Sequence, residues 1–185
     1  GATRFAHRLG FADVVPTSAP AEAKYRARMR RQAELLGRRD TTVFDWRRFW
    51  NFAGAMPADV LEWGRHGDTV GSVARTADGR FAATLSTGGT SVTLCGRVGD
   101  VPVFGCGLYA GPAGAVACTG EGEQIIRRTL ARAVYERMEK GASARQAVED
   151  AVRMFPERWD VGLIAVDRAG WGVAANRPMA YGVGN

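Results

Sequence analysis

Thr69 is the residue on which this sequence could build a covalent catalyst. It follows Asp68 and opens a stretch, residues 69–75, whose alternating small and β-branched residues favour a strand. A threonine hydroxyl needs a base, but no histidine is well placed and the chain has no G-x-S-x-G elbow. The α-amine of Thr69, with a pKa of about 7.7–8, could accept the proton, although it exists only if the Asp68–Thr69 bond is cut. The competing interpretation is an ordinary loop exit into a strand.

Further polar positions could bind an amino acid and stabilise developing charge. Arg97 and Asp100 lie three residues apart on a glycine-flanked loop. An Arg fork suits a carboxylate and an Asp suits an ammonium group, so the two could bind an amino acid or pair with each other at the surface. Thr119 and Gly120 end a strand-like run before a predicted helix, where they could form an oxyanion hole or an N-cap.

Four short motifs occur in a fixed order along this part of the chain. They are Asp68-Thr69-Val70-Gly71, Ser86-Thr87-Gly88-Gly89, Gly96-Arg97-Val98-Gly99-Asp100 and Cys118-Thr119-Gly120-Glu121-Gly122-Glu123. Together they resemble the β-subunit of the plant-type asparaginase, isoaspartyl peptidase and glycosylasparaginase family, which are N-terminal nucleophile (Ntn) hydrolases. The resemblance runs from Thr69 to the end, while residues 1–11 resemble a helix from the middle of the family's α-subunit.

The resemblance implies a protein that activates itself by autocatalytic cleavage. The Thr69 hydroxyl would attack the carbonyl of Asp68, and hydrolysis of the resulting ester would release the Thr69 α-amine. Thr87, placed opposite Thr69 by the register of the predicted hairpin, would hold the nucleophile in orientation. A plain Thr–Thr cross-strand pair is the alternative for that residue.

The resemblance also implies a substrate and the residues that bind it. Arg97, Asp100 and, through its backbone, Gly122 would bind the aspartyl end, and Thr119 with Gly120 would bind the oxyanion. The implied activity is hydrolysis of the side-chain amide of L-asparagine or of β-aspartyl dipeptides through a β-aspartyl ester, in a homo-oligomer of α/β units. Two alternatives stay open: hydrolysis of N4-glycosylated asparagine, and a non-catalytic truncated subunit that binds a partner.

Periodicity and turn residues predict the elements that must position these groups. We expect helices over residues 3–9, 21–36, 123–140 and 143–154, and strands over residues 69–75, 81–87, 101–109, 115–118, 161–166 and 171–175, with a possible edge strand at 178–183. This order indicates an α+β fold with helices on a sheet. The resemblance implies a four-layer αββα sandwich, incomplete at its N-terminus, with residues 1–68 and 69–185 as parts of an α- and a β-subunit within one structural domain.

Composition narrows the classes of partner. The net charge is +6, with its excess mostly in the first 68 residues, where arginines stand among aromatics at residues 46–52. Acidic residues interrupt this run, so we expect a solvated helix face and a packed loop rather than a nucleic-acid site. The apolar runs are too short for a bilayer, so we expect no membrane contact. The odd number of cysteines, none in a C-x-x-C pair, favours a cytoplasmic protein.

The number and spacing of the cysteines and histidines limit which metal and redox sites the sequence could form. Cys95, Cys106 and Cys118 are odd in number and form no C-x-x-C pair, and His7 and His66 are the two histidines. We therefore expect no zinc site and no cofactor. Cys106 and Cys118 lie in apolar runs, where we expect them to be small buried hydrophobes.

Overall fold

The structure is a computed structural model of the 185-residue chain. It describes residues 2–12, 18–35, 68–89 and 97–184. The chain forms two compact units, Gly1–Met56 and Pro57–Asn185, which we describe separately. The predicted loop residues His66 and Cys95, and the arginine- and aromatic-rich stretch at 46–52, lie outside the described residues.

In the first unit the described elements are two helices, close to where periodicity predicts them. They are α1, Ala2–Arg8, and α2, Ala19–Leu35. Pro20 lies in the first turn of α2, where a missing N–H costs no helical hydrogen bond. Arg26 and Arg30 are exposed, and Arg26 forms an ion pair with Glu22 one turn earlier. These arginines therefore lie on a solvated helix face, as the interrupted charge pattern predicts.

The second unit begins with a two-stranded antiparallel ribbon, β1 (Asp68–Arg75) and β2 (Phe81–Gly89). The turn between them uses Gly79 in the left-handed region, at φ +81°. The hydroxyl of Thr76 hydrogen-bonds the carboxylate of Asp78, which also accepts from Arg80. The predicted hairpin is confirmed, because its alternating strands and Asp-Gly turn are local signals that agree with each other.

The second sheet is antiparallel, with strand order β3-β4-β5-β6. The strands are β3 (Leu108–Gly111), β4 (Gly114–Gly120), β5 (Val161–Val166) and β6 (Trp171–Ala175). The predicted strands at 161–166 and 171–175 are confirmed. Residues 178–183 form no strand; they belong to an irregular tail, residues 176–184.

The predicted strand over residues 101–109 is wrong over most of its length. Residues 100–107 instead form tight turns, in which the N–H groups of Val103 and Gly107 donate to the carbonyl of Asp100. A Cβ on Gly107 would lie 2.7 Å from that carbonyl oxygen, so the turn requires glycine there. The apolar run thus folds back on itself, and β3 starts only at Leu108.

The single helix predicted over residues 123–140 is also wrong. Two helices replace it, α5 (Gly122–Arg127) and α6 (Leu130–Glu139), separated at Thr129, which has φ +42°. The N–H groups of Ala131 and Arg132 at the start of α6 donate to the carbonyls of Cys106 and Gly105. This tertiary contact satisfies the new helix N-terminus, which explains why the break is stable.

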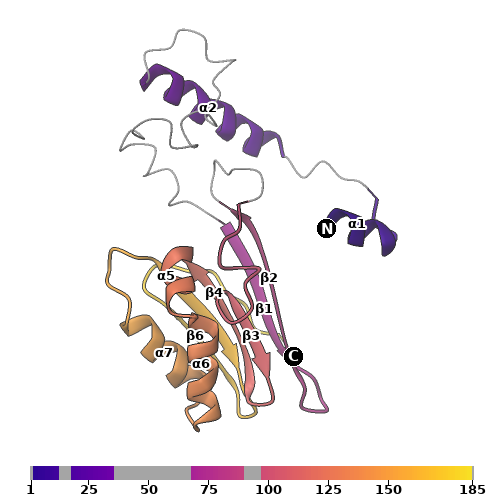
Figure 1. Ribbon diagram of the computed structural model, residues 1–185, viewed down its shortest axis with the longest axis vertical. Coiled ribbons are helices and arrows are strands. Elements are labelled where there is room, and N and C mark those ends of the chain that lie inside the picture. The colour runs from indigo at the N-terminus through magenta and orange to yellow at the C-terminus, as the bar shows by residue number, and fades with distance from the viewer. Residues whose placement is uncertain (1, 13–17, 36–67, 90–96, 185) are drawn as a thin grey trace. The chain divides into compact units, whose positions relative to one another are not determined.

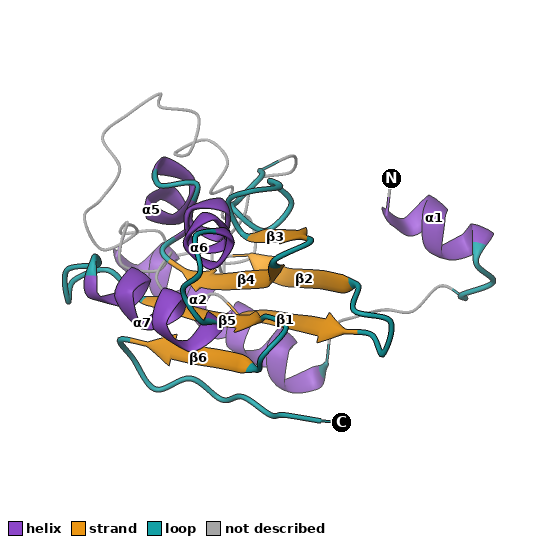
Figure 2. Cartoon of the chain, turned by 90° about the horizontal axis from the view of Figure 1, so that it is seen from below, coloured by secondary structure: helices purple, strands orange, loops and turns teal. Residues whose placement is uncertain are grey.

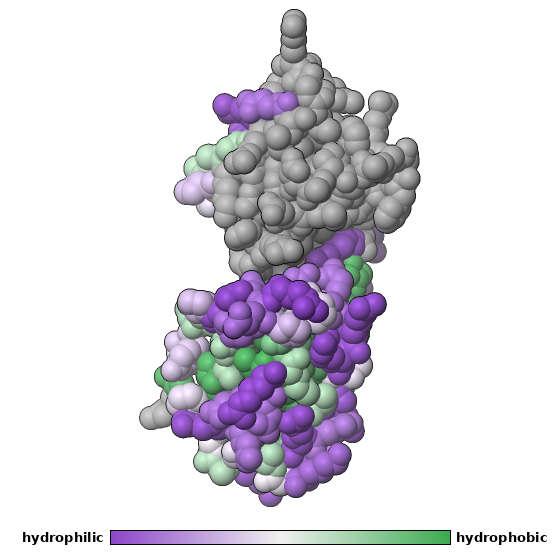
Figure 3. Space-filling model, turned by 90° about the vertical axis from the view of Figure 1, so that its left-hand side faces the viewer, coloured by the Kyte–Doolittle hydropathy of each residue, from purple (hydrophilic) through white to green (hydrophobic). Residues whose placement is uncertain are grey.

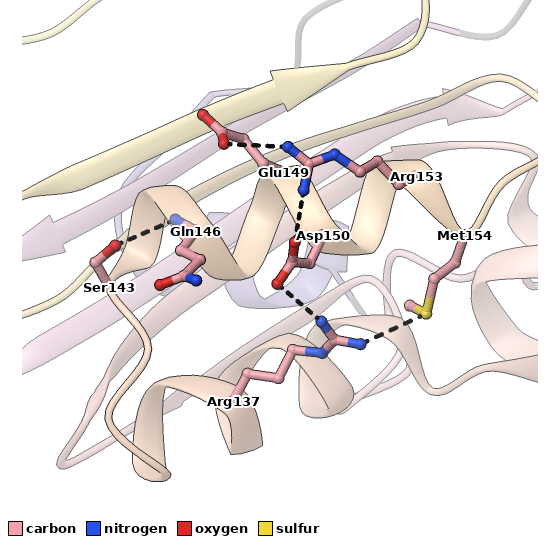
Figure 4. A network of polar contacts seen from close by, with 7 residues as sticks. All are labelled: Arg137, Ser143, Gln146, Glu149, Asp150, Arg153 and Met154. Atoms are coloured by element: carbon pink, nitrogen blue, oxygen red, sulfur yellow. Dashed lines mark hydrogen bonds and ion pairs between the residues drawn. The ribbon is translucent and has the colours of Figure 1, made fainter.

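Helix α7 (Ala144–Arg153) begins where the sequence predicts it. The Ser143 hydroxyl accepts a hydrogen bond from the Gln146 N–H, and Asp150 joins Arg137 of α6 to Arg153 of α7 (Figure 4). These ion pairs are partly exposed, so we expect each to contribute less than the apolar contacts beneath it. The network adds one ion pair, Arg137–Asp150, between α6 and α7.

The two sheets and the helices of the second unit form successive layers. Helices α5, α6 and α7 lie on one side of the four-stranded sheet, and the β1–β2 ribbon lies on the other (Figures 1 and 2). Val116 and Cys118 of β4 pack in the core with helix residues such as Val134. On the opposite face, a Cβ on Gly71 of β1 would lie 3.4 Å from Ala117 Cβ. Strand β4 is therefore buried on both faces from Gly114 to Cys118, while its last two residues, Thr119 and Gly120, reach the surface.

The surface mixes hydrophilic and apolar residues, with apolar ones gathered in a patch bordered by hydrophilic ones on the face shown in Figure 3. None of the helices that the structure describes is both long and apolar enough to cross a membrane. Within the same described residues, no three His, Cys, Asp or Glu side chains gather as metal ligands would.

Candidate functional site

Thr69 and Thr87 face each other across the ribbon, as the hairpin register predicts. They are register partners, and the Thr69 hydroxyl lies 3.4 Å from the Thr87 hydroxyl oxygen. The register shifts beside them, because Asp68 pairs with Gly89 and Gly88 is an extra residue on β2. Such a bulge re-aims side chains next to it. It lies at the Asp68–Thr69 bond, where the two residues are consecutive in β1.

A cavity of about 170 Å³ brings Thr69 together with Thr119. Its walls come from the ribbon, from β4 and β5, and from the tail; they include Leu85, Ala117, Ile164, Met179 and Tyr181. Thr69 and Thr119 are both half-buried. Two threonines from strands distant in sequence therefore line one small space, here called the threonine cavity.

Gly120 makes the sharp exit from β4. Its φ is +132°, and a Cβ there would lie 2.1 Å from the carbonyl oxygen of Asp160. The same carbonyl accepts a hydrogen bond from the Glu121 N–H at 2.8 Å. Because the atom that a Cβ would meet belongs to the backbone and cannot move aside, only glycine fits at this position. Glycine therefore lets the chain turn from Thr119 into α5. We find no side-chain cap at this end of the described helix.

Asp100 is a buried carboxylate that lies against Gly122. It is 8% exposed, and within the described residues its Oδ2 atom is buried without a hydrogen-bond partner. A Cβ on Gly122 would lie 2.7 Å from Asp100 Oδ1. Burial raises the pKa of Asp100, and the positive charge of Arg97 partly opposes that rise. A buried carboxylate oxygen without a hydrogen-bond partner is costly, so this arrangement suits an incoming cation or hydrogen-bond donor.

Arg97 lies on the exposed side of the same loop. Its guanidinium approaches Gly99, where a Cβ would lie 2.9 Å from Arg97 Nη1. No ion pair joins Arg97 to Asp100 in the described part of the chain, so the surface pair that the sequence left open is not formed. The guanidinium is therefore available to a carboxylate from outside, close to a buried negative charge.

The sequence-predicted residues thus form two clusters joined by one short segment. Thr69, Thr87 and Thr119 surround or adjoin the threonine cavity, and Arg97, Asp100 and Gly122 form the charged cluster. Gly120 lies on the segment Thr119–Gly122 that connects them. The charged cluster is not among the residues that line the cavity. Such an arrangement can place a hydroxyl nucleophile beside a second hydroxyl, with charged groups at one end.

The tail residues Met179 and Tyr181 are site residues that sequence reasoning missed. They line the threonine cavity together with Gly162 of β5. A Cβ on Gly162 would lie 2.5 Å from Met179 Sδ and 3.2 Å from Thr119 Cγ2. No local pattern in the sequence signals this contact, because it depends on where the tail passes after β6.

Comparisons with known proteins give one consistent result. The asparaginase family matches residues 1–182. A plant-type L-asparaginase of Pyrobaculum calidifontis is 37% identical over 175 residues, which cover 92% of this chain and 52% of that protein. An isoaspartyl peptidase of Salmonella typhimurium is 36% identical over 200 residues, 96% of this chain and 58% of that protein.

A third relative supports the same grouping over a shorter stretch. A probable isoaspartyl peptidase/L-asparaginase of Arabidopsis thaliana is 45% identical over 104 residues, 56% of this chain and 32% of that protein. The chain therefore spans between about a third and three fifths of the length of these curated relatives.

Proposed function

The chain belongs to the asparaginase family, and from this premise we propose that it forms the catalytic part of an Ntn amidohydrolase. The substrates are L-asparagine and β-aspartyl dipeptides, and the nucleophile is Thr69. The observation that carries the proposal is the threonine cavity, which Thr69 and Thr119 both line, with Thr87 facing Thr69 across the ribbon. The relatives described above bear asparaginase and isoaspartyl peptidase names, which favours these substrates over N4-glycosylated asparagine.

Activation begins with cleavage of the Asp68–Thr69 peptide bond. The Thr69 hydroxyl oxygen attacks the Asp68 carbonyl carbon, the C–N bond breaks, and the Thr69 nitrogen takes a proton to become a free amine. Water then hydrolyses the ester and restores the hydroxyl. The bulge beside this bond supports the step, because it releases the local backbone from regular pairing. The new amine, with a pKa of about 7.7–8, is the base that the hydroxyl lacks.

Catalysis uses the same hydroxyl a second time. The Thr69 amine accepts the hydroxyl proton, and the oxygen attacks the side-chain amide carbonyl of the substrate. Thr119 and Gly120 stabilise the oxyanion, and collapse of the intermediate expels ammonia or an amine, which takes the proton. Water hydrolyses the β-aspartyl ester and releases aspartate. Losing one oxyanion donor typically costs about 10²–10³ in rate, so loss of the Thr119 hydroxyl should slow catalysis by about that factor, whereas loss of the Thr69 hydroxyl should abolish it.

The charged cluster selects the aspartyl end of the substrate. Arg97 binds the α-carboxylate through its two-pronged guanidinium, and Asp100 binds the α-ammonium group. Burial of the Asp100 carboxylate supports this role, because its unmet hydrogen-bonding capacity is satisfied when the ammonium group arrives. Gly122 leaves the room that this carboxylate occupies.

The observed layers support a four-layer architecture. The ribbon, the four-stranded sheet and α5–α7 correspond to the β, β and one of the α layers of an αββα sandwich (Figure 1). We infer that a further helical layer completes the fold in the whole protein. In this scheme residues 1–68 belong to the α-subunit, and residues 69–185 form the β-subunit that starts with the nucleophile.

Intact mass and ammonia release test this function together. We expect the purified protein to separate into two fragments that divide between Asp68 and Thr69, and to release ammonia from L-asparagine. Thr69→Ala should abolish both events. Thr84→Ala, at an exposed threonine on β2, is the matched control and should leave both unchanged. A single uncut chain that releases no ammonia would contradict the proposal.

A further inference from the structure

The threonine cavity has a chemistry that catalysis alone does not explain. Apart from the hydroxyl-bearing residues Thr69, Thr119 and Tyr181, its lining side chains are mostly apolar, and no charged residue contributes to it. Leu85, Ala117, Ile164 and Met179 are among these residues. A water-filled space needs polar partners, whereas an apolar one is better filled by an apolar group.

The tail makes one wall of this cavity through a close contact that depends on glycine. A Cβ added to Gly162 would lie only 2.5 Å from Met179 Sδ, so any side chain at this position would collide with Met179. That Cβ would also lie 3.2 Å from Thr119 Cγ2, and Gly162 and Thr119 are register partners on β5 and β4. The bare backbone at Gly162 thus allows Met179 to reach toward Thr119, beside the reacting position.

The charged residues of the proposed site lie outside the threonine cavity, which limits how a substrate can be oriented. Arg97 and Asp100 are not among the lining residues, and Gly122, which contacts Asp100, lies three positions after Thr119. If the aspartyl end is held at the charged cluster and its amide carbonyl at Thr69, the bond to be cut points away from those charges. The part of the substrate beyond that bond then enters the apolar cavity.

Size limits what can enter. At about 170 Å³ the cavity is smaller than the roughly 300–1,000 Å³ of sites that bury drug-sized ligands. It has room for the side chain of one amino acid, and its few hydroxyl-bearing residues, Thr69, Thr119 and Tyr181, are too few to pair with the many hydroxyls of a glycan.

Resting on the function proposed above, we infer that the threonine cavity binds the leaving group, and that β-aspartyl dipeptides with an apolar C-terminal residue are the preferred peptide substrates. Met179 is the specificity-determining residue. It contacts the leaving-group side chain and takes no part in bond cleavage. One methylene more or less in a hydrophobic pocket typically changes kcat/KM by about 10-fold or more, so the preference is large enough to measure.

The test compares kcat/KM for β-Asp-Leu, β-Asp-Gly and β-Asp-Lys, with L-asparagine as the reference substrate. For the wild-type protein we expect β-Asp-Leu to exceed the other two dipeptides by about 10-fold. Met179→Ala should reduce the Leu-to-Gly ratio toward one. Met179→Glu should reverse the Leu-to-Lys preference, because it places a negative charge beside the ammonium group; a merely structural role would not give this reversal. Met154→Ala, at an exposed methionine at the end of α7, is the matched control and should change no ratio.

The outcomes separate the two proposals. If the wild-type protein hydrolyses L-asparagine but treats the three dipeptides alike, the inference is overturned and the proposed function stands. The same holds if Met179→Ala and Met179→Glu retain the wild-type ratios. If none of the four substrates is hydrolysed, the proposed function fails and the inference fails with it.

Discussion

Thr69 and Thr87 are register partners whose hydroxyl oxygens lie 3.4 Å apart, next to the bulge formed by the extra residue Gly88. The distance exceeds that of a usual O–H···O hydrogen bond, which is about 2.7–2.8 Å. Catalytic hydrogen bonds are often long before substrate binds and shorten in the complex. In the proposed mechanism Thr87 orients the Thr69 oxygen, and a contact of this length is weak enough not to immobilise it.

Thr87→Val tests this relationship. The substitution keeps the β-branched shape and removes the hydroxyl, so we expect kcat to fall by about 10²-fold, in the range of general acid–base and orienting effects. The free energy of unfolding should change little, since a cross-strand threonine pair contributes only about 0.2–1 kcal/mol. Kinetics with L-asparagine and urea unfolding measure the two quantities. Thr84→Val on the same strand is the control, and an equal loss of kcat there would refute the role of Thr87.

Gly122→Ala should weaken substrate binding without touching the nucleophile. The added Cβ would lie 2.7 Å from Asp100 Oδ1, so the carboxylate must move from its buried position. Since Asp100 binds the substrate ammonium group in the proposed mechanism, we expect KM to rise at least about 10-fold, the scale of one lost charge-assisted hydrogen bond.

Gly170→Ala is the comparison for that variant. An added Cβ at Gly170 meets nothing within 4 Å, so it should leave KM unchanged. Self-cleavage should proceed in both variants, because neither change reaches Asp68 or Thr69. A Gly122→Ala protein with normal KM would show that the Asp100 position does not matter to substrate binding.

The buried carboxyl of Asp100 should also make stability depend on pH. Burial raises its pKa above the ordinary value of 3.8, so the ionised form is disfavoured in the folded state. Below 3.8 the group is protonated in both the folded and unfolded states and costs nothing. As pH rises through the raised folded-state pKa, the group ionises at a cost and stability is lost.

Asp100→Asn removes that cost. The variant should therefore gain stability over the wild type as pH rises, and the gain should vanish in acid. Asp78→Asn should show the opposite pH dependence. Hydrogen bonding with Thr76 lowers the pKa of Asp78, so the ionised carboxylate makes a small contribution to stability that is lost as pH falls. The variant should therefore be slightly less stable than the wild type at neutral pH, and the difference should vanish in acid. Urea unfolding between about pH 3 and pH 7 measures both. A constant difference across that range for Asp100→Asn would contradict the assignment.

The first turn of α7 offers a prediction about the fold alone. Ser143 has an extended backbone and its hydroxyl accepts a hydrogen bond from the Gln146 N–H at 3.2 Å (Figure 4). Ser143→Ala should lower the free energy of unfolding by about 1 kcal/mol, while Ser143→Gly should lower it by only a few tenths. Both variants should keep full activity, because α7 is separated from the threonine cavity by the sheet. Equal stability of the serine and alanine proteins would show that the cap is not formed.

Local signals predicted the elements that depend on local interactions. The ribbon, β5, β6 and the start of α7 follow from alternation, turn residues and a capping serine, which act over a few neighbouring positions. The position of Thr87 opposite Thr69 followed from the same register. The four motifs also named Arg97, Asp100, Thr119, Gly120 and Gly122 as site residues, which stays a prediction. In the structure Asp100 lies against Gly122, and Thr69 and Thr119 line one cavity.

The features that the sequence did not predict depend on contacts between segments that are distant in the chain. The break at Thr129 interrupts a good helical pattern, because the carbonyls of Gly105 and Cys106 satisfy the N–H groups of a second helix start. The run at 101–109 has strand-like composition, but its glycines let it turn onto the Asp100 carbonyl. Met179 enters the site only because the tail crosses Gly162.

The two described cysteines test how the sheet and the helices pack. Cys106 and Cys118 are buried in the core, and Cys118 packs with residues of α6. Burial raises the pKa of both thiols, with a further contribution from the negative charge of Asp100. The thiolate is the reactive form, so both low access and low ionisation should slow alkylation.

In a Cys95→Ser background, we expect both thiols to react with a disulfide reagent orders of magnitude more slowly in the native protein than in urea. Asp100→Asn should leave the native reaction slow, because burial is the larger cause of the raised pKa. A native rate equal to the unfolded rate would mean that β4 is open to solvent on the helix side. The threonine cavity on its other face would then lose the rigid wall that holds Thr119 beside Thr69.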